Sequence, residues 1–577
     1  MLPTEQSGRN WSRISILLPI VLAAIVYLFS TTTRGVIDYD EGYYAQAAKN
    51  MAESGDWVTP YVNGVRFLEK PPFLYWITAA SFKVLGVNEF ALRLPTALAV
   101  IALVWIVALM ARRLGNDRAA LIAGLSTAFS VGTYLFTRET LHDVWLVLFL
   151  ALALYAFVEW YLDPLHSRLR ALLFYGAVAG AVLCKSLIGI AFPVGIIAIF
   201  FFLSRERPHW RTLHLLPGLI LFLGLTVPWH WLAAARNRGF LDFFFVGEQF
   251  LRFFGKREPP VLWSLPVFTF WALTLVWFFP WTAFLPAAFA EIGKSQDRNQ
   301  RMLVRLALIW AGVILGFFSI SGRLEHYAFP AIPAFSLFVA GALSRGESKW
   351  VLWAFRGLAI LGILAIVLGA GAGIWFFALH GSQFTSAGPA NRLSETDFSI
   401  LAEMPAVVLS NLLKPAAVTV ISLAIGFWTA LRFETRRRRM HAVICLAAAM
   451  MVVFGAAHWS LHICEDLISS KRFATAVSRE ARPGDRLVVV GDYEEANSLN
   501  FYEPLQVEVC EGTAYALIPG MKYHDAPKLV MTYKEFQSAW ASAGRIFALV
   551  PKNRASELNP EGIVIISVLD RVLLRNH

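Results

Sequence analysis

Charged residues are scarce in this chain: they make up 16% of its 577 residues, whereas 57% are hydrophobic. A soluble globular protein of this length would carry more charge, so the composition excludes that class and indicates an integral membrane protein. The net charge of +11 does not indicate nucleic acid binding, because the basic residues cluster between hydrophobic spans, where they orient a protein against a membrane.

Cysteine and the usual motifs of soluble enzymes are also rare. Of four cysteines, Cys184 and Cys445 fall in hydrophobic spans, and Cys464 and Cys510 lie in the polar C-terminal region. A disulfide between the latter two requires that region to be extracytoplasmic. No His and Cys residues have the spacing of a zinc site, no serine sits in a nucleophile elbow, and no glycine-rich repeat marks a nucleotide site.

The N-terminal segment has no features of a cleavable signal peptide. Arg9 and Arg13 precede a hydrophobic span over 15–30, and no small-residue cleavage site stands out after it. This pattern predicts a signal anchor with the N-terminus in the cytoplasm.

Apolar runs of about twenty residues, enough to cross the hydrocarbon core, recur along the chain. The run over 72–86 is shorter, at about fifteen residues, and we expect it to lie flat at the interface. The basic loops then all fall on one side, which the positive-inside rule makes cytoplasmic. About thirteen crossings are predicted, near 14–30, 91–111, 118–137, 143–163, 170–185, 187–204, 213–232, 264–289, 302–320, 326–343, 350–378, 413–432 and 438–458.

The chain changes character after about residue 459. A charged helical pattern over 465–482 is followed by short β-rich runs at 486–491, 506–510, 528–532, 545–550 and 562–568. The predicted fold is therefore an α-helical polytopic membrane domain over 1–458, with interfacial helices, and a small extracytoplasmic α/β domain over 459–577.

Carboxylates and basic groups gather in the loops predicted to be extracytoplasmic. Lysine and arginine at the headgroup level neutralise phosphate, and a nearby carboxylate acts as a general base or binds a divalent cation. A single lysine or arginine there more often anchors a helix, but clustered acids serve no anchoring purpose. The pattern indicates a site for a phosphate-containing lipid, drawn from Asp38, Asp40, Glu41, Glu69, Lys70, Arg138, Glu139, His142, Asp143, Lys185, Glu248, Arg252, Lys256, Arg257, Arg323, Glu325, His326 and Tyr327.

The order and spacing of several short motifs across about 1–345 resemble one family. They are Asp40-Glu41, Leu68-Glu69-Lys70-Pro71-Pro72, the segment from Glu89 through Arg93 to Pro95, Arg138 with Asp143, Pro228-Trp229, Phe244 with Glu248 and Arg252-Phe253, Pro280-Trp281, and Arg323 with His326-Tyr327 and Pro330. Together these resemble the C-type glycosyltransferases, in the protein O-mannosyltransferase-like branch that includes bacterial aminoarabinose transferases of lipid A.

The resemblance implies roles for individual residues. Asp40 would be the main catalytic carboxylate and Asp143 the second acidic position. Glu69 would bind a divalent metal ion, either zinc or magnesium or manganese, with His326 as a further candidate ligand. The residues implied in binding the substrate or the lipid phosphate are Lys70, Arg252, Tyr327, Tyr44, Glu41 and Arg138. Tyr44 also lies on the apolar face of an amphipathic helix predicted over 40–54, where packing is the alternative role.

The implied function is transfer of a sugar, 4-amino-4-deoxy-L-arabinose, from undecaprenyl phosphate to lipid A phosphate at the periplasmic face of the bacterial inner membrane. The implied partners are these lipids and the protein is expected to be a monomer. Gly42-Tyr43 and Cys184-Lys185-Ser186 depart from the family pattern, so transfer to a protein or envelope glycan stays open. A lipid-linked sugar transporter is less favoured, because transporters place charges at the bilayer midplane and carry internal repeats.

Overall fold

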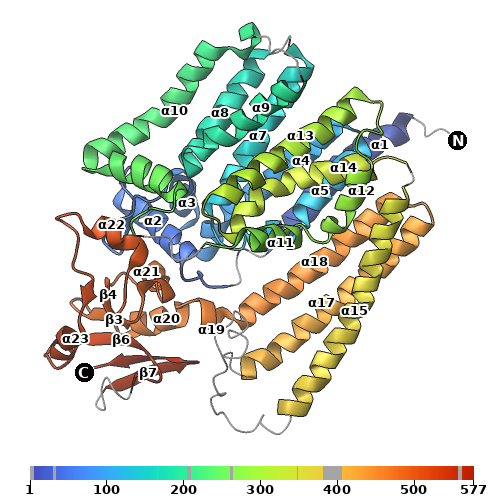
Figure 1. Ribbon diagram of the computed structural model, residues 1–577. Coiled ribbons are helices and arrows are strands. Elements are labelled where there is room, and N and C mark those ends of the chain that lie inside the picture. The colour runs from blue at the N-terminus through green and yellow to red at the C-terminus, as the bar shows by residue number, and fades with distance from the viewer. Residues whose placement is uncertain are drawn as a thin grey trace.

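The structure is a computed structural model that describes residues 5–29, 31, 34–164, 167–204, 210–259, 264–346, 348–380, 406–555 and 562–577. Most of the outer loop predicted at 379–412 lies outside the described residues. Long apolar helices form one body, and the smaller C-terminal region packs against one end of it (Figure 1).

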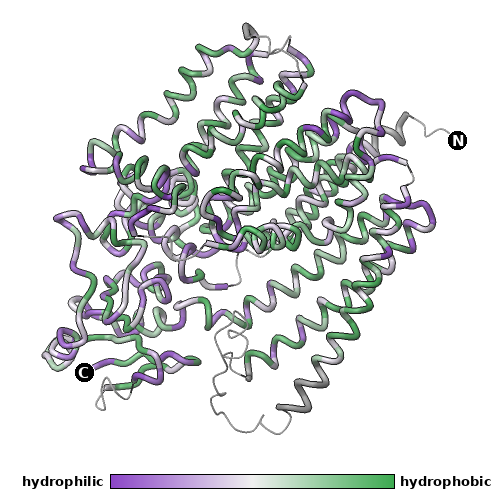
Figure 2. The backbone as a smooth tube through the Cα atoms, in the orientation of Figure 1, coloured by the Kyte–Doolittle hydropathy of each residue, from purple (hydrophilic) through white to green (hydrophobic). Residues whose placement is uncertain are grey.

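Ten helices in the described chain are long and apolar enough to cross a membrane. Hydrophobic residues cover their length, and hydrophilic residues concentrate at their ends and in the C-terminal region (Figure 2). This distribution is the one expected for helices that lie in lipid. The ten are α1 (Glu5–Phe29), α4 (Glu89–Leu114), α7 (His142–Leu162), α8 (Ser167–Lys185), α10 (Leu215–Arg236), α13 (Arg298–Ile320), η5 with α14 (Glu325–Leu343), α15 (Lys349–His380), α17 (Ala406–Thr435) and α18 (Arg439–Ile463).

The remaining three predicted crossings are shorter or broken. The span at 118–137 divides into α5 (Asp117–Ala128) and α6 (Val131–Leu135), and α9 (Ile188–Ser204) has 17 residues. The span at 264–289 bends by 97° between α11 (Val267–Trp277) and the segment of η4 (Trp281–Phe284) and α12 (Leu285–Ala290). Pro280 lies at this bend and cannot donate a helical hydrogen bond. If the bent pair counts as one crossing, the described total is eleven.

Two short helices and a hairpin connect α1 to α4. They are α2 (Asp40–Ser54), β1 (Tyr61–Val62), β2 (Val65–Arg66) and α3 (Phe73–Leu85). The helix predicted over 40–54 is confirmed by α2, although its residues over 41–48 are buried on every side and not on one face only. With 13 residues, α3 is about 20 Å long and too short to cross the hydrocarbon core, in keeping with the flat segment predicted over 72–86.

The C-terminal region contains a six-stranded sheet in the order β5-β4-β3-β6-β8-β7. The first four strands in this order are parallel, and β8 and β7 pair antiparallel at one edge. Each of the five predicted β-rich runs contains one strand, and β8 was not predicted. The strands are β3 (Arg486–Val490), β4 (Val507–Cys510), β5 (Val530–Met531), β6 (Ile546–Pro551), β7 (Ile563–Val568) and β8 (Arg571–Arg575).

Short helices flank the sheet. They are α19 (Glu465–Ile468), α20 (Lys471–Glu480), η6 (Tyr493–Glu495), α21 (Leu499–Tyr502), η7 (Tyr515–Leu517), α22 (Ile518–Met521) and α23 (Tyr533–Trp540). The four cysteines are free thiols, so the disulfide considered between Cys464 and Cys510 does not form in this structure.

Helix α2 is fixed to the C-terminal region along its length. The Tyr43 hydroxyl donates to Glu494 Oε1 at 2.6 Å, and Gln46 Nε2 donates to the carbonyl of Asn497 at 2.6 Å. Just before the helix, Asp38 accepts hydrogen bonds from the Ser498 amide (2.7 Å) and the Ser470 hydroxyl (3.0 Å). The C-terminal region therefore determines where α2, and Asp40 at its first turn, is held.

We expect Asp38→Ala to destabilise this docking by about 1–3 kcal/mol, because two buried donors lose their acceptor. Burial raises the pKa of Asp38 to about 6, and the nearby positive charge of Arg571 partly opposes this rise. A folded-state pKa above the unfolded value means that the contact is most stable below about pH 4 and weakens as the pH rises through 6. Thermal unfolding of wild type, Asp38→Ala and Asp38→Asn across pH 4–8 tests this. Asp38→Asn retains an acceptor and should lose the pH dependence, and an Asp38→Ala protein as stable as wild type would contradict it.

Candidate active site

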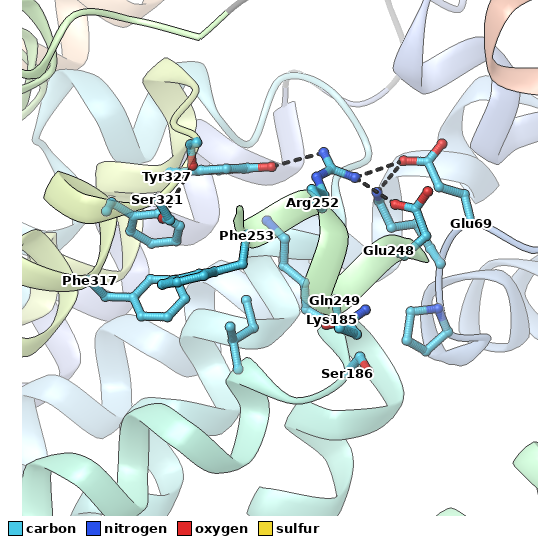
Figure 3. A pocket seen from close by; sticks show the side chains of 15 residues that line it. Glu69, Lys185, Ser186, Glu248, Gln249, Arg252, Phe253, Phe317, Ser321 and Tyr327 are labelled. Atoms are coloured by element: carbon cyan, nitrogen blue, oxygen red, sulfur yellow. Dashed lines mark hydrogen bonds and ion pairs between the residues drawn. The ribbon is translucent and has the colours of Figure 1, made fainter. Parts of the chain in front are cut away.

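A pocket lies where the turn before α3 meets the ends of α8, α13 and the segment after α10. One part of its wall is charged or polar, with Lys70, Lys185, Arg252 and Tyr327, and another part is aromatic, with Phe253, Phe317 and Phe318. Figure 3 shows that Arg252 and Tyr327 point toward each other and that Phe253 and Phe317 lie close together. Such a wall fits a ligand that is anionic at one end and apolar at the other.

Arg252 is the centre of the polar wall. It follows η3 (Asp242–Leu251), a π-helical segment, and its Nη1 bonds Glu248 at 2.9 Å and Glu69 at 3.3 Å. Its Nη2 donates to the Tyr327 hydroxyl at 3.2 Å (Figure 3). Arg257 also pairs with Glu248 and, at 3.8 Å, with Glu69. These contacts fix the guanidinium fork, and a fixed fork suits bidentate binding of phosphate.

Asp143 and Lys185 form the adjoining part of the site. Lys185 Nζ lies 2.5 Å from Asp143 Oδ1 and 4.5 Å from the centre of the Tyr327 ring. His326 Nε2 lies 3.9 Å from the other carboxylate oxygen of Asp143. The structure thus brings Asp143, Lys70, Arg252, Tyr327 and His326 into one region.

Asp40 is the first residue of α2 and is solvent-exposed, although protein surrounds it on most sides. This surrounding protein raises the pKa of Asp40. The positive charges of Lys70 and Arg252 oppose the rise, and the negative charges of Glu69 and Asp143 add to it. Because the charges that act on Asp40 are those of the pocket, the carboxylate belongs to the same electrostatic site. It stands there with a higher proton affinity than an ordinary aspartate.

Three predicted substrate-binding residues lie outside the pocket lining. Glu41 is fully buried and accepts bonds from Arg93 at 2.8 Å and Arg34 at 3.2 Å. Burial opposes its ionisation, yet Arg93 and Arg34 hold its pKa down to about 2. The backbone carbonyl of Arg138 accepts a hydrogen bond from Arg34, and the Arg138 guanidinium carbon lies 4.4 Å from the centre of the Tyr134 ring.

Tyr44 is the third of these predicted substrate-binding residues. Its ring centre lies 4.7 Å from that of His142, edge-on, and 6.1 Å from that of Tyr75. In this structure Tyr44, Glu41 and Arg138 therefore support the loops around the pocket, and their roles in substrate binding stay predictions.

Known proteins resemble this chain in sequence and in fold. The family described as dolichyl-phosphate-mannose-protein mannosyltransferase matches residues 69–231. A crystal structure of ArnT from Cupriavidus metallidurans bound to undecaprenyl phosphate superposes with a TM-score of 0.82 and 25% identity, over 97% of this chain and 98% of that one. The chain is thus similar to these transferases in sequence over part of its length and in fold over nearly all of it.

Several named proteins are similar to the chain in sequence. An undecaprenyl phosphate-α-4-amino-4-deoxy-L-arabinose arabinosyl transferase from Pseudomonas aeruginosa is 31% identical over 63% of this chain and 65% of its own length. The enzyme of the same description from Yersinia enterocolitica is 28% identical over 60% and 62%. The match thus spans a little less than two thirds of these relatives. An oligosaccharyltransferase from Archaeoglobus fulgidus, at a TM-score of 0.50 and 16% identity, shares the fold.

The surroundings of Glu69 do not fit the divalent ion that the family resemblance implies. This carboxylate already pairs with Lys70, Arg252 and Arg257. Burial alone would raise its pKa, but these three positive charges hold the pKa well below the usual range. Among the described residues, no three His, Cys, Asp or Glu side chains form a group that could hold a metal. A divalent ion at Glu69 stays a prediction from the resemblance alone.

The sequence predicted Lys185, Glu248 and Arg257 in outer loops near the lipid site but assigned them no individual role. Their partners became visible only in the structure, where Lys185 pairs with Asp143, and Arg257 pairs with Glu248 and with the distant Glu69. The aromatic wall was not predicted. Phe317-Phe318 followed by Ser321-Gly322 at the end of a span is the sequence signal that could have indicated it.

Glu139, in the loop between α6 and α7, is a carboxylate whose charge state should affect donor binding. Burial first, and then Asp40 and Glu41, raise its pKa to about 8, so it is mostly protonated at pH 7. Above pH 8 it adds a negative charge near Asp40. We expect wild type to bind undecaprenyl phosphate about two- to fivefold more weakly at pH 9 than Glu139→Gln, and equally well at pH 7. Titration of both proteins at the two pH values measures this, and equal affinities at pH 9 would contradict it.

Proposed function

We propose that this protein transfers 4-amino-4-deoxy-L-arabinose from undecaprenyl phosphate to a phosphate of lipid A, at the periplasmic side of the bacterial inner membrane. The observation that carries the proposal is the pocket with a cationic wall and an aromatic wall, beside a carboxylate of raised pKa. The names of the relatives at 28–31% identity support the sugar and the lipid carrier.

The pocket residues suit the donor. The lipid phosphate would lie against Lys70 and Arg252, with the Tyr327 hydroxyl beside them, and the first isoprene units against Phe253 and Phe317. As the bond between the sugar and the phosphate breaks, negative charge grows on the departing lipid phosphate. Cations already fixed in place stabilise that charge with little reorganisation.

The carboxylates act on the other side of the sugar. An oxygen of the acceptor attacks the anomeric carbon, the bond from this carbon to the lipid phosphate oxygen breaks, and its electron pair leaves with the phosphate. An ionised phosphate acceptor needs positioning, whereas a hydroxyl acceptor must give its proton to Asp40. The raised pKa of Asp40 suits a group that accepts a proton in the reaction.

Mass spectrometry of lipid A from cells with and without this protein tests the function. Aminoarabinose on the lipid A phosphates is expected only when the protein is present. Unmodified lipid A, together with a sugar change in envelope protein or glycan, would replace the proposal with the alternative acceptor. Purified protein supplied with both lipids should perform the same transfer.

The periplasmic site has its own test. The basic loops and the shortness of α3 support a topology in which the acidic loop and the C-terminal region share the outer side. A phosphatase reporter fused after His577 is therefore expected to be active, and a reporter that works only in the cytoplasm should be silent there. The reverse result would place the site on the cytoplasmic side and overturn the proposed topology.

A further inference from the structure

Ser186 lies in the turn between α8 and α9 and lines the pocket proposed for the donor, next to Lys185 (Figure 3). The residue is only 1% exposed, and its hydroxyl forms no hydrogen bond with any residue that the structure describes. A buried hydroxyl without a partner costs free energy, because it has lost its contact with water and gained nothing in return. In the wall of a pocket, such a hydroxyl is a donor that a ligand can use.

The backbone of Ser186 carries a second cost. Its φ is +57°, in the left-handed region, where a Cβ atom crowds the backbone and glycine is favoured. The Ser186 amide donates to the Val182 carbonyl at 2.8 Å, and the Ser186 carbonyl accepts from the Gly189 amide at 2.9 Å.

Close packing of the two helices enforces this turn. A Cβ atom on Gly189, in the first turn of α9, would lie 2.5 Å from backbone atoms of Ala181 and Val182 in α8. The chain therefore has little room to leave α8 by a wider path. Glycine at position 186 would follow the same path without strain, so the packing of the helices does not explain the choice of serine.

Serine at this position thus costs stability twice, and glycine would avoid both costs. Strained residues and unpaired buried groups persist mainly where they serve a function. The neighbouring Lys185 is already engaged, since its Nζ lies 2.5 Å from Asp143 Oδ1 and 4.5 Å from the centre of the Tyr327 ring. The Ser186 hydroxyl beside it still has a hydrogen bond to give.

We propose that Ser186 is a further donor-binding residue, whose hydroxyl donates a hydrogen bond to a phosphate oxygen of the donor lipid. The inference rests on the proposed function and adds a residue to its donor site. A hydroxyl binds an ionised phosphate oxygen more strongly than a neutral acceptor. Lys70 and Arg252 supply the charge that attracts the phosphate, and Ser186 fixes its orientation at the end of α8.

The test compares Ser186→Ala and Ser186→Gly with wild type, as full-length protein in detergent. Both variants lack the hydroxyl, but only glycine also relieves the left-handed backbone. The matched control is Ser336→Ala, which removes from α14 another buried hydroxyl that has no partner in the described chain and lies outside the pocket. Each protein is titrated with undecaprenyl phosphate and with undecaprenol, which has the same chain and no phosphate.

Both Ser186 variants are expected to bind undecaprenyl phosphate about tenfold more weakly, which is the effect of losing one hydrogen bond to a charged group. Their affinity for undecaprenol should stay within twofold of wild type, and Ser336→Ala should match wild type with both lipids. Without lipid, Ser186→Ala should melt no lower than wild type, and Ser186→Gly no lower than Ser186→Ala, because the strain is relieved. A residue that only holds the turn would lose stability and lipid binding together.

Four results would overturn the inference. They are unchanged binding of undecaprenyl phosphate by either Ser186 variant, an equal loss of affinity for both lipids, a fall in melting temperature alongside the loss of binding, and a similar loss in Ser336→Ala. Failure of the proposed function looks different. Wild-type protein would then transfer no sugar to lipid A, while the dependence of undecaprenyl phosphate binding on Ser186 would remain.

Discussion

Asp40→Asn is expected to lower sugar transfer by about 10²- to 10⁴-fold, the range that a positioned carboxylate usually contributes. The change is isosteric and removes only the charge and the proton affinity, so folding should be unaffected. Because surrounding protein raises the pKa of Asp40, wild-type turnover should fall on acidification at a higher pH than an ordinary aspartate, near 3.9, would give. Turnover of purified protein between pH 4 and 8 measures both effects.

Glu53→Gln is the matched control for this change, because Glu53 is an exposed carboxylate at the other end of α2. It should leave turnover and its pH profile unchanged. Near-normal turnover by Asp40→Asn would show that Asp40 is not the catalytic carboxylate and would leave Asp143 as the candidate.

Arg252→Ala and Lys70→Ala are each expected to weaken binding of undecaprenyl phosphate by about ten- to a hundredfold. Each variant loses a charge-assisted contact to the phosphate worth about 1.5–3 kcal/mol. Arg252→Lys should recover only part of the loss, since an ammonium group cannot reproduce the fork that bonds Glu69, Glu248 and Tyr327 together. Binding titrations and turnover at saturating acceptor provide the measurement.

The double variant Lys70→Ala/Arg252→Ala distinguishes shared from separate action. If both cations bind one phosphate, the double variant should be little worse than either single one, because the two groups act as a unit. Unchanged binding and unchanged turnover in both single variants would show instead that these residues only anchor the turn and η3 at the interface.

The sequence by itself determined the class of protein and most of its helices. Runs of about twenty apolar residues can satisfy their backbone in lipid only as helices, so their positions follow from composition. The amphipathic pattern over 40–54 and the five β-rich runs were likewise readable, because side-chain periodicity depends on local geometry. The strand β8 was missed because its pattern is short and lies at the chain end.

Only the tertiary structure decided which charged residues belong to the pocket. Glu41 and Asp40 are neighbours in sequence, yet Glu41 is buried against Arg34 and Arg93 while Asp40 lies in the field of Lys70 and Arg252. The local sequence pattern does not distinguish these two carboxylates. Their roles separate because partners from distant segments supply the charges, and distances between such segments depend on packing and not on spacing along the chain.

A cavity of about 630 Å³ between the membrane domain and the C-terminal region was equally unpredictable from the sequence. Arg238 and Lys522 stand nearly three hundred residues apart, and each alone reads as an ordinary exposed cation. They line one space because α22 packs against β2 through Gly520 and the Arg66 backbone. A contact of that kind is determined by the shapes of two surfaces, which a linear pattern of residues does not encode locally.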